Sequence, residues 1–474
     1  MSPSSAIVIG LDAGTTSTKM VAVDNEGVIQ ASADSDPIPT LVPSPGASLQ
    51  QMSTIWNALV TACRRGMSSL DSSTPVAALA LATQSGSVVP VEQLEGGVEP
   101  NLITWMDRRS QDLVRDWDAE TRRTIRALSG WTPSPGLGLS TISWLRSETG
   151  LEPSRWASID DFLVHELTGS WITNPSNAAG MQLMDVSSLS WSSELCKIAK
   201  VEMSALSALS PSGEQAGHLT AIASKTMALP QGIPVVIGGH DQSCAAFGLG
   251  LTTPGSALLS LGTAWVLTTI TDRGDTAVLP HSFNLSPHVV PGRWTVSSHL
   301  GDLGTTLASA MPKEANKLDS KLAHRSPDID DPYFLLSLPD LEGNKVGHFS
   351  GPATTDPIVR LRAVMEACAF EARLTIEQTS SSVPINDLTV AGGGTNSRFL
   401  TQKIADATGM PLTVRREASQ PAVGAAMLAA RACGWPTLTD IKTSVEMIRP
   451  SCRHADTMNR RYAEYCRLTS GDRR

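Results

Sequence analysis

Residues 10–27 of this 474-residue chain, GLDAGTTSTKMVAVDNEG, combine a carboxylate, hydroxyl groups, glycine and lysine at a spacing that suits phosphate binding. The apolar runs at 6–11 and 20–23 predict two short strands joined by this polar turn. Backbone N–H groups, hydroxyls and an ammonium group are donors for phosphate oxygens, and the turn supplies them from Gly14, Thr15, Thr16, Ser17 and Lys19. Asp12, at the end of the first strand, would face a bound cation. The same residues also fit an ordinary hairpin with a turn rich in Thr and Ser.

A second acidic residue, Asp241, follows a predicted buried strand at 233–238 and a pair of residues, Gly239 and His240. Open α/β sheets bind ligands at the carboxyl ends of their strands, so Asp241 is our candidate for a general base that accepts a proton from an alcohol. Its position at a helix start fits a plain N-cap equally well. His240 and Asp241 could also ligate a metal in a phosphohydrolase, but the nine histidines form no cluster in the sequence.

The composition is that of a globular protein, with 41% hydrophobic and 18% charged residues. The net charge of −9 argues against nucleic acid as a partner, and no apolar run reaches the length of a membrane span. Seven scattered cysteines without a C-x-x-C pair predict reduced thiols and no zinc site. These features, with an N-terminus that lacks a signal sequence, predict a cytoplasmic protein.

Strands and helices alternate along the whole chain, which predicts an α/β fold. In the first half we expect a helix from Thr54 to Arg65, capped by Ser53 and ended by Gly66, and a second helix that ends at Thr168. Asp160 or Asp161 is the expected cap of that second helix. The connector after residue 250 predicts a first domain at 1–250 and a second at 251–474.

The second half of the chain also begins with a predicted strand–turn–strand unit followed by alternating helices and strands. The runs at 257–261 and 266–270 predict a second hairpin, with Gly262 and Thr263 in its turn. A long helix from Pro357, capped by Asp356, precedes a strand at 388–390, a glycine run at 392–394 and a helix at 396–408. A strand, a glycine run and a helix N-terminus together suit a bound nucleotide. Two such halves predict a duplicated architecture with a cleft between them.

These segments resemble, in order and over nearly the whole chain, the motifs of the FGGY family of carbohydrate kinases within the actin-like ATPase superfamily. The matching motifs are Asp12 to Lys19, Leu49-Gln50-Gln51 with Trp56, Gln84-Ser85-Gly86, Thr104 to Arg109, Asp161 to Leu163, Leu167 to Gly169, Thr173, Ser176 to Ala178, Gly239 to Gln242, Leu261 to Thr263 and Gly392 to Ser397. The resemblance implies two ribonuclease H-like domains with a catalytic cleft between them, and ATP-dependent phosphorylation of a sugar hydroxyl with Mg²⁺.

The resemblance also implies roles for individual residues. Asp241 would be the general base, and Asp12 would hold Mg²⁺. The sugar site would contain Gln84, Ser85, Gly86, Trp105, Asp107, His240, Asp241 and Gln242. The ATP site would contain Gly14, Thr15, Thr16, Ser17, Lys19, Gly262, Thr263, Gly301, Gly393, Gly394 and Ser397. Trp105 alone has the competing interpretation of a core residue.

The substrate implied is a small-molecule ketose such as a pentulose, as in xylulokinases. Ser85-Gly86 replaces both the Arg-Glu pair that glycerol kinases place after the glutamine and the Met-His pair of xylulokinases. Another polyol or sugar (glycerol, erythritol, a hexulose or a heptulose) therefore stays open, as do a non-catalytic sugar-binding regulator and an ATPase of the actin or chaperone type. Homodimers are common among similar proteins, which is the basis for expecting one here.

Overall fold

The computed structural model describes residues 6–91, 100–310, 322, 328–336, 347–416, 419–435 and 445–469. These residues form two compact units. The first unit contains the described parts of Met1–Thr252, Thr271–Thr295 and Ala418–Lys442, and the second contains those of Thr253–Ile270, Val296–Glu417 and Thr443–Arg474. The division expected near residue 250 lies close to the first of these boundaries, but neither unit is continuous in the sequence.

The first unit is built on a six-stranded sheet with the strand order β13-β14-β5-β1-β2-β3. Its strands are β1 (Ile7–Ala13), β2 (Thr18–Asp24), β3 (Ile29–Asp34), β5 (Val76–Thr83), β13 (Gln215–His218) and β14 (Pro234–His240). The predicted hairpin of β1 and β2 is confirmed, with Ala13 opposite Thr18. Strands β1, β5 and β14 are parallel, so their carboxyl ends lie at one edge of the sheet.

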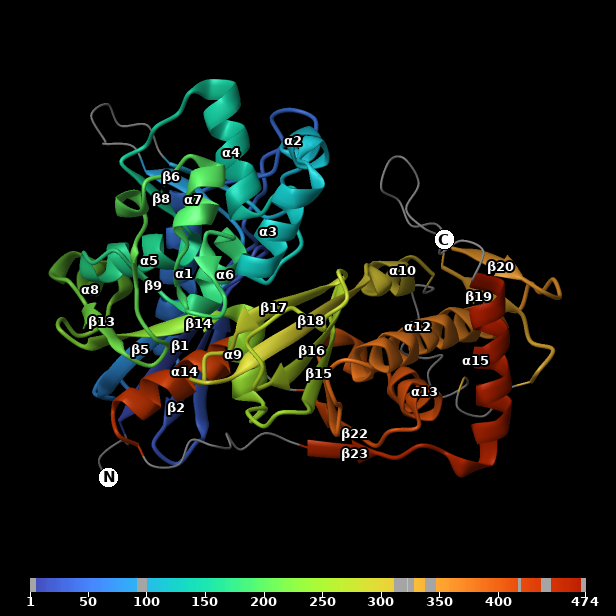
Figure 1. The fold of residues 1–474 in the computed structure, drawn as a ribbon. Helices are drawn as coiled ribbons and strands as arrows, with labels where there is room; N and C mark the ends of the chain where they lie inside the picture. Colours follow the sequence, from blue (N-terminus) through green and yellow to red (C-terminus); the bar gives the residue numbers. More distant parts are fainter. Residues whose placement is uncertain are drawn as a thin grey trace. The chain divides into compact units, whose positions relative to one another are not determined.

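The two faces of this sheet bury different kinds of side chain. Large residues of β1, including Ile7 and Leu11, pack with helix α1 (Met52–Met67) on one face. The other face carries small residues and packs against α14 (Gln420–Ala432), which Figure 1 shows beside β1 and β5. A Cβ atom at Gly10 would lie 1.8 Å from the carbonyl oxygen of Ala422, so this approach requires glycine. Segment 420–432 therefore belongs to the first unit despite its late place in the chain.

Smaller elements complete the first unit. The helices are α2 (Gln111–Asp116), α3 (Ala119–Ser129), α4 (Gly138–Thr149), α5 (Ile159–Thr168), α6 (Pro175–Met181), α7 (Ser193–Ala199), α8 (Ala221–Met227), α9 (Asp241–Gly248) and the 3₁₀ turn η1 (Met203–Ala205). The short strands are β4 (Leu49–Gln51), β6 (Val89–Val91), β7 (Asn101–Ile103), β8 (Arg155–Ala157), β9 (Ile172–Thr173), β10 (Met184–Asp185), β11 (Ser190–Trp191), β12 (Ala208–Leu209) and β17 (Phe283–Pro287).

Three expected helix boundaries of the first unit are wrong: the start and the end of α1, and the cap of α5. Helix α1 begins at Met52, before the predicted cap Ser53, and it continues past Gly66 to Met67. Gly66 serves packing instead, because a Cβ atom there would lie 2.3 Å from the sulfur of Met20. The N-cap of α5 is Ser158, whose backbone N–H donates to Oδ1 of Asp161 at 2.6 Å. Asp161 thus completes a capping box from the third helical position rather than capping the helix itself.

The second unit contains a sheet in which β18 (Trp294–Gly301), β16 (Trp265–Thr271), β15 (Ser256–Leu261), β21 (Asp387–Ala391), β22 (Leu412–Arg415) and β23 (Val445–Ile448) are neighbours in that order. The other elements are α10 (Leu303–Ala310), α12 (Pro357–Ser380), α13 (Arg398–Thr408), α15 (Ala455–Thr469), β19 (Tyr333–Leu335), β20 (His348–Ser350), η2 (Gly393–Asn396) and η3 (Cys452–His454). The predicted β15–β16 hairpin and the Asp356 cap of α12 are confirmed.

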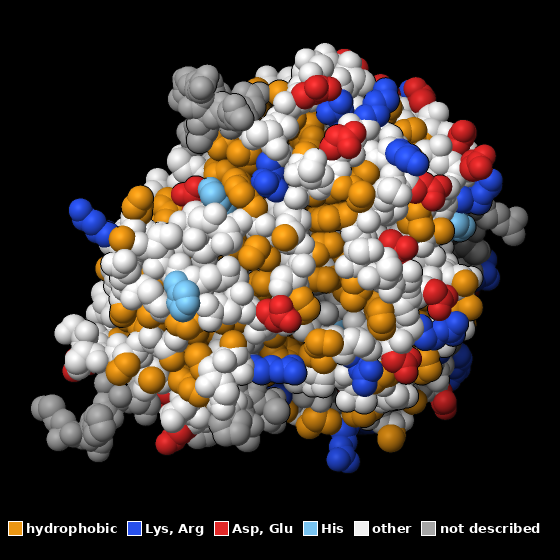
Figure 2. Space-filling model, turned by 60° about the vertical axis from the view of Figure 1, so that its left-hand side comes forward, with side chains coloured by type: hydrophobic (Ala, Val, Ile, Leu, Met, Phe, Trp, Pro, Cys, Tyr) orange, Lys and Arg blue, Asp and Glu red, His pale blue; other side chains and the backbone are white. Residues whose placement is uncertain are grey.

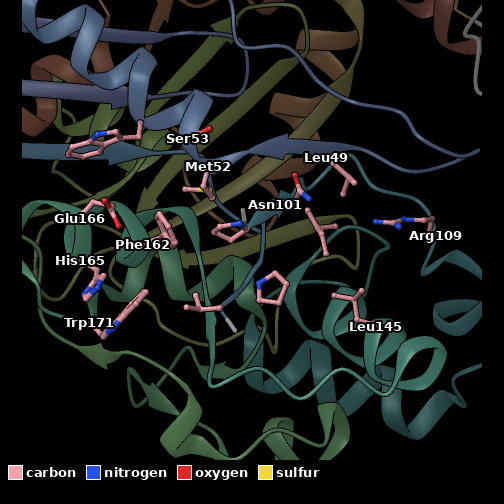
Figure 3. Close-up of a pocket in the computed structure, with 15 residues that line it drawn as sticks. Leu49, Met52, Ser53, Asn101, Arg109, Leu145, Phe162, His165, Glu166 and Trp171 are labelled. Atoms are coloured by element: carbon pink, nitrogen blue, oxygen red, sulfur yellow. The ribbon is translucent and has the colours of Figure 1, made fainter. Parts of the chain in front are cut away.

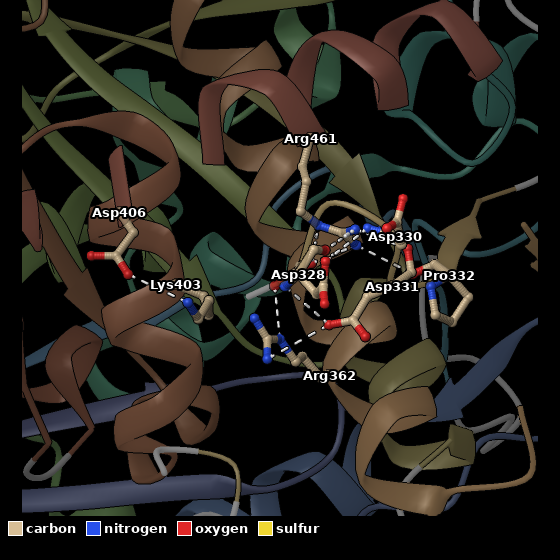
Figure 4. A network of polar contacts seen from close by, with 9 residues as sticks. Asp328, Asp330, Asp331, Pro332, Arg362, Lys403, Asp406 and Arg461 are labelled. Carbon is tan, nitrogen blue, oxygen red and sulfur yellow. Dashed lines mark hydrogen bonds and ion pairs between the residues drawn. The ribbon is translucent and has the colours of Figure 1, made fainter. Parts of the chain in front are cut away.

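A buried ion network ties α12 to α15 in the second unit (Figure 4). The guanidinium of Arg461 donates to Oε2 of Glu366 at 2.9 Å and to the backbone carbonyls of Asp328, Asp331 and Pro332. Arg362 pairs with the same carboxylate at 3.0 Å. Burial alone would raise the pKa of Glu366, but the two guanidinium groups lower it below its usual value. Charge in this core is therefore compensated by direct pairing.

The surface mixes charges of both signs. On the face shown in Figure 2, Lys and Arg side chains lie among Asp and Glu side chains. None of the helices in the described ranges has the length and apolar character needed to cross a bilayer.

Candidate active site

The parallel strands of the first unit bring three predicted residues to one edge of the sheet. Ala13 and His240 both pair with Thr83, so the ends of β1, β5 and β14 lie side by side. Asp12 lies at the end of β1, Gln84 directly follows β5, and Asp241 directly follows β14. Residues that are 72 to 229 positions apart in the sequence thus meet at the edge where open sheets bind ligands.

Asp12 is a buried carboxylate, and one of its two oxygens has no hydrogen-bond partner among the described residues. The hydroxyl of Ser419 donates to its Oδ2 at 2.8 Å, while Oδ1 is buried and has no hydrogen-bond partner among the described residues. Burial, followed by the negative charge of Asp241, raises the pKa of Asp12 to about 7. An unpartnered oxygen of this kind suits a cation. The described residues contain no group of three or more His, Cys, Asp or Glu side chains placed to hold a metal, so a cation here would keep several of its waters, as Mg²⁺ does.

Asp241 is the first residue of α9, and the N-cap position is occupied by His240, which makes no side-chain cap bond. The alternative interpretation of Asp241 as the N-cap is therefore wrong. Its carboxylate is about a quarter exposed (24%), and its Oδ1 lies 3.1 Å from Nε2 of His240. An accessible carboxylate beside an imidazole can accept a proton from a bound alcohol.

In the loop after β5, the side-chain amide of Gln84 has one donor, Nε2, without a hydrogen-bond partner among the described residues. Oε1 of Gln84 accepts hydrogen bonds from the hydroxyls of Thr15 at 3.0 Å and Ser87 at 3.3 Å. Its Nε2 is buried and has no partner among the described residues, so it is the atom of Gln84 that can donate to a ligand. Ser85 is turned to the backbone carbonyl of Asn177, and Gly86 adopts a φ of +88°. At that φ any larger residue would be strained.

Trp105 and Asp107 differ in their surroundings. Trp105 is 40% exposed, so it is not a core residue, and its Nε1 donates to the hydroxyl of Thr15 at 3.2 Å. Asp107 is buried and accepts bonds from the backbone N–H groups of Ser48 and Arg109 and from the Arg109 guanidinium. Both carboxylate oxygens of Asp107 therefore already accept hydrogen bonds from protein donors.

The remaining predicted residues of the first phosphate turn lie at the surface or half-buried. Gly14, Ser17 and Lys19 are half-buried and Thr16 is exposed. The carbonyl of Thr15 accepts a hydrogen bond from Nε2 of Gln50 at 2.7 Å. Gln242 follows Asp241 in α9, and its Oε1 is buried without a partner in the described part of the chain.

The second unit carries the other predicted ATP residues at the ends of its own strands. Gly262 and Thr263 lie exposed in the β15–β16 turn, and the backbone N–H of Gly304 donates to the carbonyl of Thr263 at 3.0 Å. Gly301, at the end of β18, has a φ of +86°. A Cβ atom at Gly393 would meet nothing within 4 Å, whereas one at Gly394 would lie 2.8 Å from Cβ of Leu261.

The helix expected to begin at Asn396 begins later. A 3₁₀ turn covers Gly393–Asn396, and α13 starts at Arg398. The hydroxyl of Ser397 accepts the backbone N–H of Leu400 at 3.1 Å, so Ser397 is the N-cap of α13. Its predicted contact with ATP stays a prediction.

A cavity of about 600 Å³ lies elsewhere in the first unit. Its walls come from β4, α1, α5, β6 and β7, and Figure 3 shows Trp171 beside His165 on one side and Arg109 on another. The rings of His165 and Trp171 stack with centroids 4.0 Å apart. None of the residues predicted for the sugar or ATP sites lines this cavity.

Two contacts at the site could not be found from the sequence. Ser419 lies 407 positions from Asp12, and no spacing pattern joins them. Ser176 accepts the backbone N–H of His240 at 2.9 Å. Ser176 lies in the FGGY-like motif Ser176 to Ala178, but the motif does not indicate which group its hydroxyl contacts.

Comparison with known proteins gives a consistent result. Residues 7–248 match the model of the N-terminal domain of the FGGY family of carbohydrate kinases, and residues 263–433 match that of its C-terminal domain. A xylulose kinase of Staphylococcus xylosus is 26% identical, covering 91% of this chain and 92% of that protein. An apulose kinase of Pectobacterium atrosepticum is 25% identical with 94% of both chains covered. A glycerol kinase of Ralstonia pickettii is 27% identical with 90% of both chains covered.

Solved structures share the fold. A xylulose kinase from Rhodospirillum rubrum has a TM-score of 0.86 at 24% identity, with 98% of each chain covered. A glycerol kinase from Plasmodium falciparum, solved with ADP, has a TM-score of 0.84 at 19% identity and the same coverage. At these identities the likeness establishes the two-domain, actin-like α/β architecture.

Proposed function

The chain belongs to the FGGY family of carbohydrate kinases, and we propose that it transfers the γ-phosphoryl group of ATP to a hydroxyl of a ketose such as a pentulose. The observation that carries this proposal is the accessible Asp241 carboxylate, 3.1 Å from His240 Nε2, at the sheet edge where Gln84 also lies. Relatives named for xylulose and apulose support a pentulose.

In the proposed reaction Asp241 accepts the proton of the attacking hydroxyl. The hydroxyl oxygen then forms a bond to the γ-phosphorus while the bond from that phosphorus to the bridging oxygen breaks, which releases ADP. His240 Nε2 orients the carboxylate through the contact at 3.1 Å. Phosphoryl transfer needs positioning and charge compensation more than covalent chemistry, and a base in the right place supplies the first of these.

The sugar would be recognised by the donors that the protein leaves unused. Gln84 Nε2 is buried without a partner in the described structure, so an oxygen of the sugar would complete its hydrogen bonding. The exposed indole of Trp105 offers an apolar surface to the carbon skeleton of the sugar. We assign Asp107 a positioning role, because its oxygens are already bound by Arg109 and Ser48.

In the first unit, the glycine-containing turn with Thr16, Ser17 and Lys19 would bind phosphate oxygens of the nucleotide. Contacts of Gly262, Thr263 and Gly393, in the second unit, with ATP stay predictions from the sequence. Asp12, whose Oδ1 is unpartnered in the described structure, is the residue that fits Mg²⁺. Bound Mg²⁺ would neutralise charge on the β- and γ-phosphates. A cytoplasmic location and a homodimer stay predictions from the sequence.

A glycerol kinase activity is the second candidate, because glycerol kinases are among the relatives at 25–27% identity. The Ser85-Gly86 pair, in place of the Arg-Glu pair of the glycerol kinase pattern, favours a larger substrate. A coupled assay of ADP release decides between them. It would test pentuloses, hexuloses, heptuloses, glycerol and erythritol at saturating ATP and Mg²⁺. Turnover of a pentulose supports the proposal, whereas turnover of glycerol alone, or of none, contradicts it.

A further inference from the structure

The first turn of helix α6 contains two residues that are hydrogen-bonded to two different segments of the proposed site. The hydroxyl of Ser176 accepts the backbone N–H of His240 at 2.9 Å, next to the proposed base. The backbone carbonyl of the neighbouring Asn177 accepts a hydrogen bond from the hydroxyl of Ser85 at 3.0 Å. The side-chain Oδ1 of Asn177 accepts one from the hydroxyl of Thr83 at 3.3 Å. One turn of helix is therefore bonded both to the base segment and to the sugar loop.

The start of α6 is itself fixed by a buried chain of hydrogen bonds. Ser176 donates its hydroxyl to Oδ1 of Asn174 at 2.6 Å, and Asn174 donates through Nδ2 to Oδ2 of Asp160 at 3.0 Å. The hydroxyl of Thr173 reaches the same Asp160 oxygen at 2.9 Å. These residues are all at least 97% buried, so solvent cannot replace a lost bond.

Ser176 also packs closely against the carboxyl end of β14. A Cβ atom at Gly239 would lie 2.8 Å from the Ser176 hydroxyl, so the backbone of Gly239 is in close contact with the Ser176 side chain. The register between β14 and β5 shifts between Val236 and Gly239. After this irregularity, the hydroxyl of Ser176 gives the N–H of His240 a fixed partner.

We propose that Ser176, held by Asn174 and Asp160, is a positioning residue that sets the place of the Asp241 carboxylate relative to the sugar loop. This inference rests on the proposed kinase function. Displacement of a catalytic group by about 1 Å can cost on the order of a hundredfold in rate, so a residue that never touches the substrate can control the rate in this way.

The test compares Ser176→Ala with Ser176→Cys, which fills the same space with a weak acceptor, and with Ser176→Thr, which keeps the hydroxyl. The matched control is Ser140→Ala in α4, because Ser140 is equally buried and its hydroxyl, within the described residues, bonds only to Ser110 and to the backbone carbonyls of Ser134 and Leu137. Steady-state kinetics with the sugar that the wild-type protein phosphorylates, sugar-independent ATP hydrolysis and melting temperature are measured for each.

We expect Ser176→Ala and Ser176→Cys to lower kcat by about 10-fold to 100-fold, with the KM values for sugar and ATP within about threefold of wild type. Sugar-independent ATP hydrolysis should not change, and Ser176→Thr should recover most of the lost kcat. Ser140→Ala should keep the wild-type kcat.

A kcat within about twofold of wild type in either soluble variant, Ser176→Ala or Ser176→Cys, would overturn the inference. An equal loss in Ser140→Ala would also overturn it, because the effect would then be general instability. If the wild-type protein phosphorylates no sugar, the proposed function fails instead, and that outcome is visible before any variant is made.

Discussion

The hydroxyl of Thr15 donates to Oε1 of Gln84 at 3.0 Å, which joins the turn after β1 to the loop after β5. The same hydroxyl accepts the indole N–H of Trp105 at 3.2 Å. A residue predicted to contact phosphate is therefore bonded to two residues predicted to contact sugar. This arrangement satisfies the oxygen of the Gln84 amide and leaves its Nε2 as the donor available to a ligand.

Replacing Gln84 by leucine should weaken sugar binding. Leaving a substrate oxygen without its buried partner costs about 1–3 kcal/mol, so the KM for the sugar should rise by about 5-fold to 150-fold. The KM for ATP should change little. Steady-state kinetics with each substrate varied in turn measure both. Gln111→Leu, at an exposed position of α2, is the control. An unchanged sugar KM in Gln84→Leu would remove Gln84 from the sugar site.

Replacing Asp241 by asparagine should abolish phosphoryl transfer, because an amide cannot accept the proton of the sugar hydroxyl. General base catalysis typically contributes about a hundredfold or more, so kcat should fall by at least this factor while the affinity for ATP stays nearly unchanged. Single-turnover kinetics and equilibrium binding of ATP measure the two effects. Asp112→Asn, on the surface of α2, controls for the loss of charge. A variant that keeps more than about a tenth of the wild-type kcat would show that Asp241 is not the base.

The sequence predicted the local parts of this structure well, because their causes are local. The β1–β2 and β15–β16 hairpins follow from short apolar runs around polar turns, and Asp356 caps α12 as its position before Pro357 suggests. Segments that resemble the FGGY motifs also predict Gln84 and Asp241 as site residues, and the structure places both at the same edge of the sheet.

The features that the sequence did not predict depend on contacts between distant segments. Gly66 looked like a helix stop, but its lack of a side chain makes room for Met20, which no pattern near residue 66 reveals. The return of α14 to the first unit depends on Gly10 and Ala422, which lie more than 400 positions apart. The contact of Asp107 with the sugar stays a prediction, and its partner Ser48, 59 positions away, could not be inferred from the motif. Pairing of this kind is a property of the fold.

Replacing Gly393 by valine should raise the KM for ATP by more than about tenfold and leave the sugar KM within about threefold of wild type. The structure suits this test, because a Cβ atom at Gly393 would meet nothing within 4 Å and the substitution should not disturb folding. The β-branched side chain would instead occupy the space proposed for the nucleotide. Kinetics at varied ATP, together with a melting temperature equal to that of the wild type, check the prediction. An unchanged ATP KM would show that this glycine run does not bind the nucleotide.

Replacing Arg461 by methionine should destabilise the second unit by about 3–5 kcal/mol, because it removes one partner of a buried charge network. Arg461 is 1% exposed, and its guanidinium satisfies Glu366 and three backbone carbonyls. Denaturant unfolding followed by circular dichroism measures the change. Arg460→Met removes the same charge from an exposed neighbour and should cost little. Equal effects of the two substitutions would contradict the structural role of the network.

Replacing Asp160 by asparagine should change how stability depends on pH. Burial, followed by the charge of the adjacent Asp161, raises the pKa of Asp160 to about 7 from a usual value near 4. The folded state therefore binds more protons at this site than the unfolded state between pH 4 and 7, and the free energy of unfolding falls as the pH rises through that window. A shift of this size corresponds to about 4 kcal/mol at most.

The asparagine variant lacks this titration, while the contribution of Asp12 is common to both proteins. Relative to wild type, Asp160→Asn should therefore gain stability between pH 5 and pH 8, by several kcal/mol as an upper limit. Urea unfolding at several pH values measures the difference between the two proteins at each pH. The hydrogen bonds from Thr173 and Asn174 can be accepted by the amide oxygen, so the variant should fold. Stability curves that run parallel from pH 5 to pH 8 would mean that Asp160 titrates normally, and that the buried chain from Asp160 to Ser176 is solvated in solution.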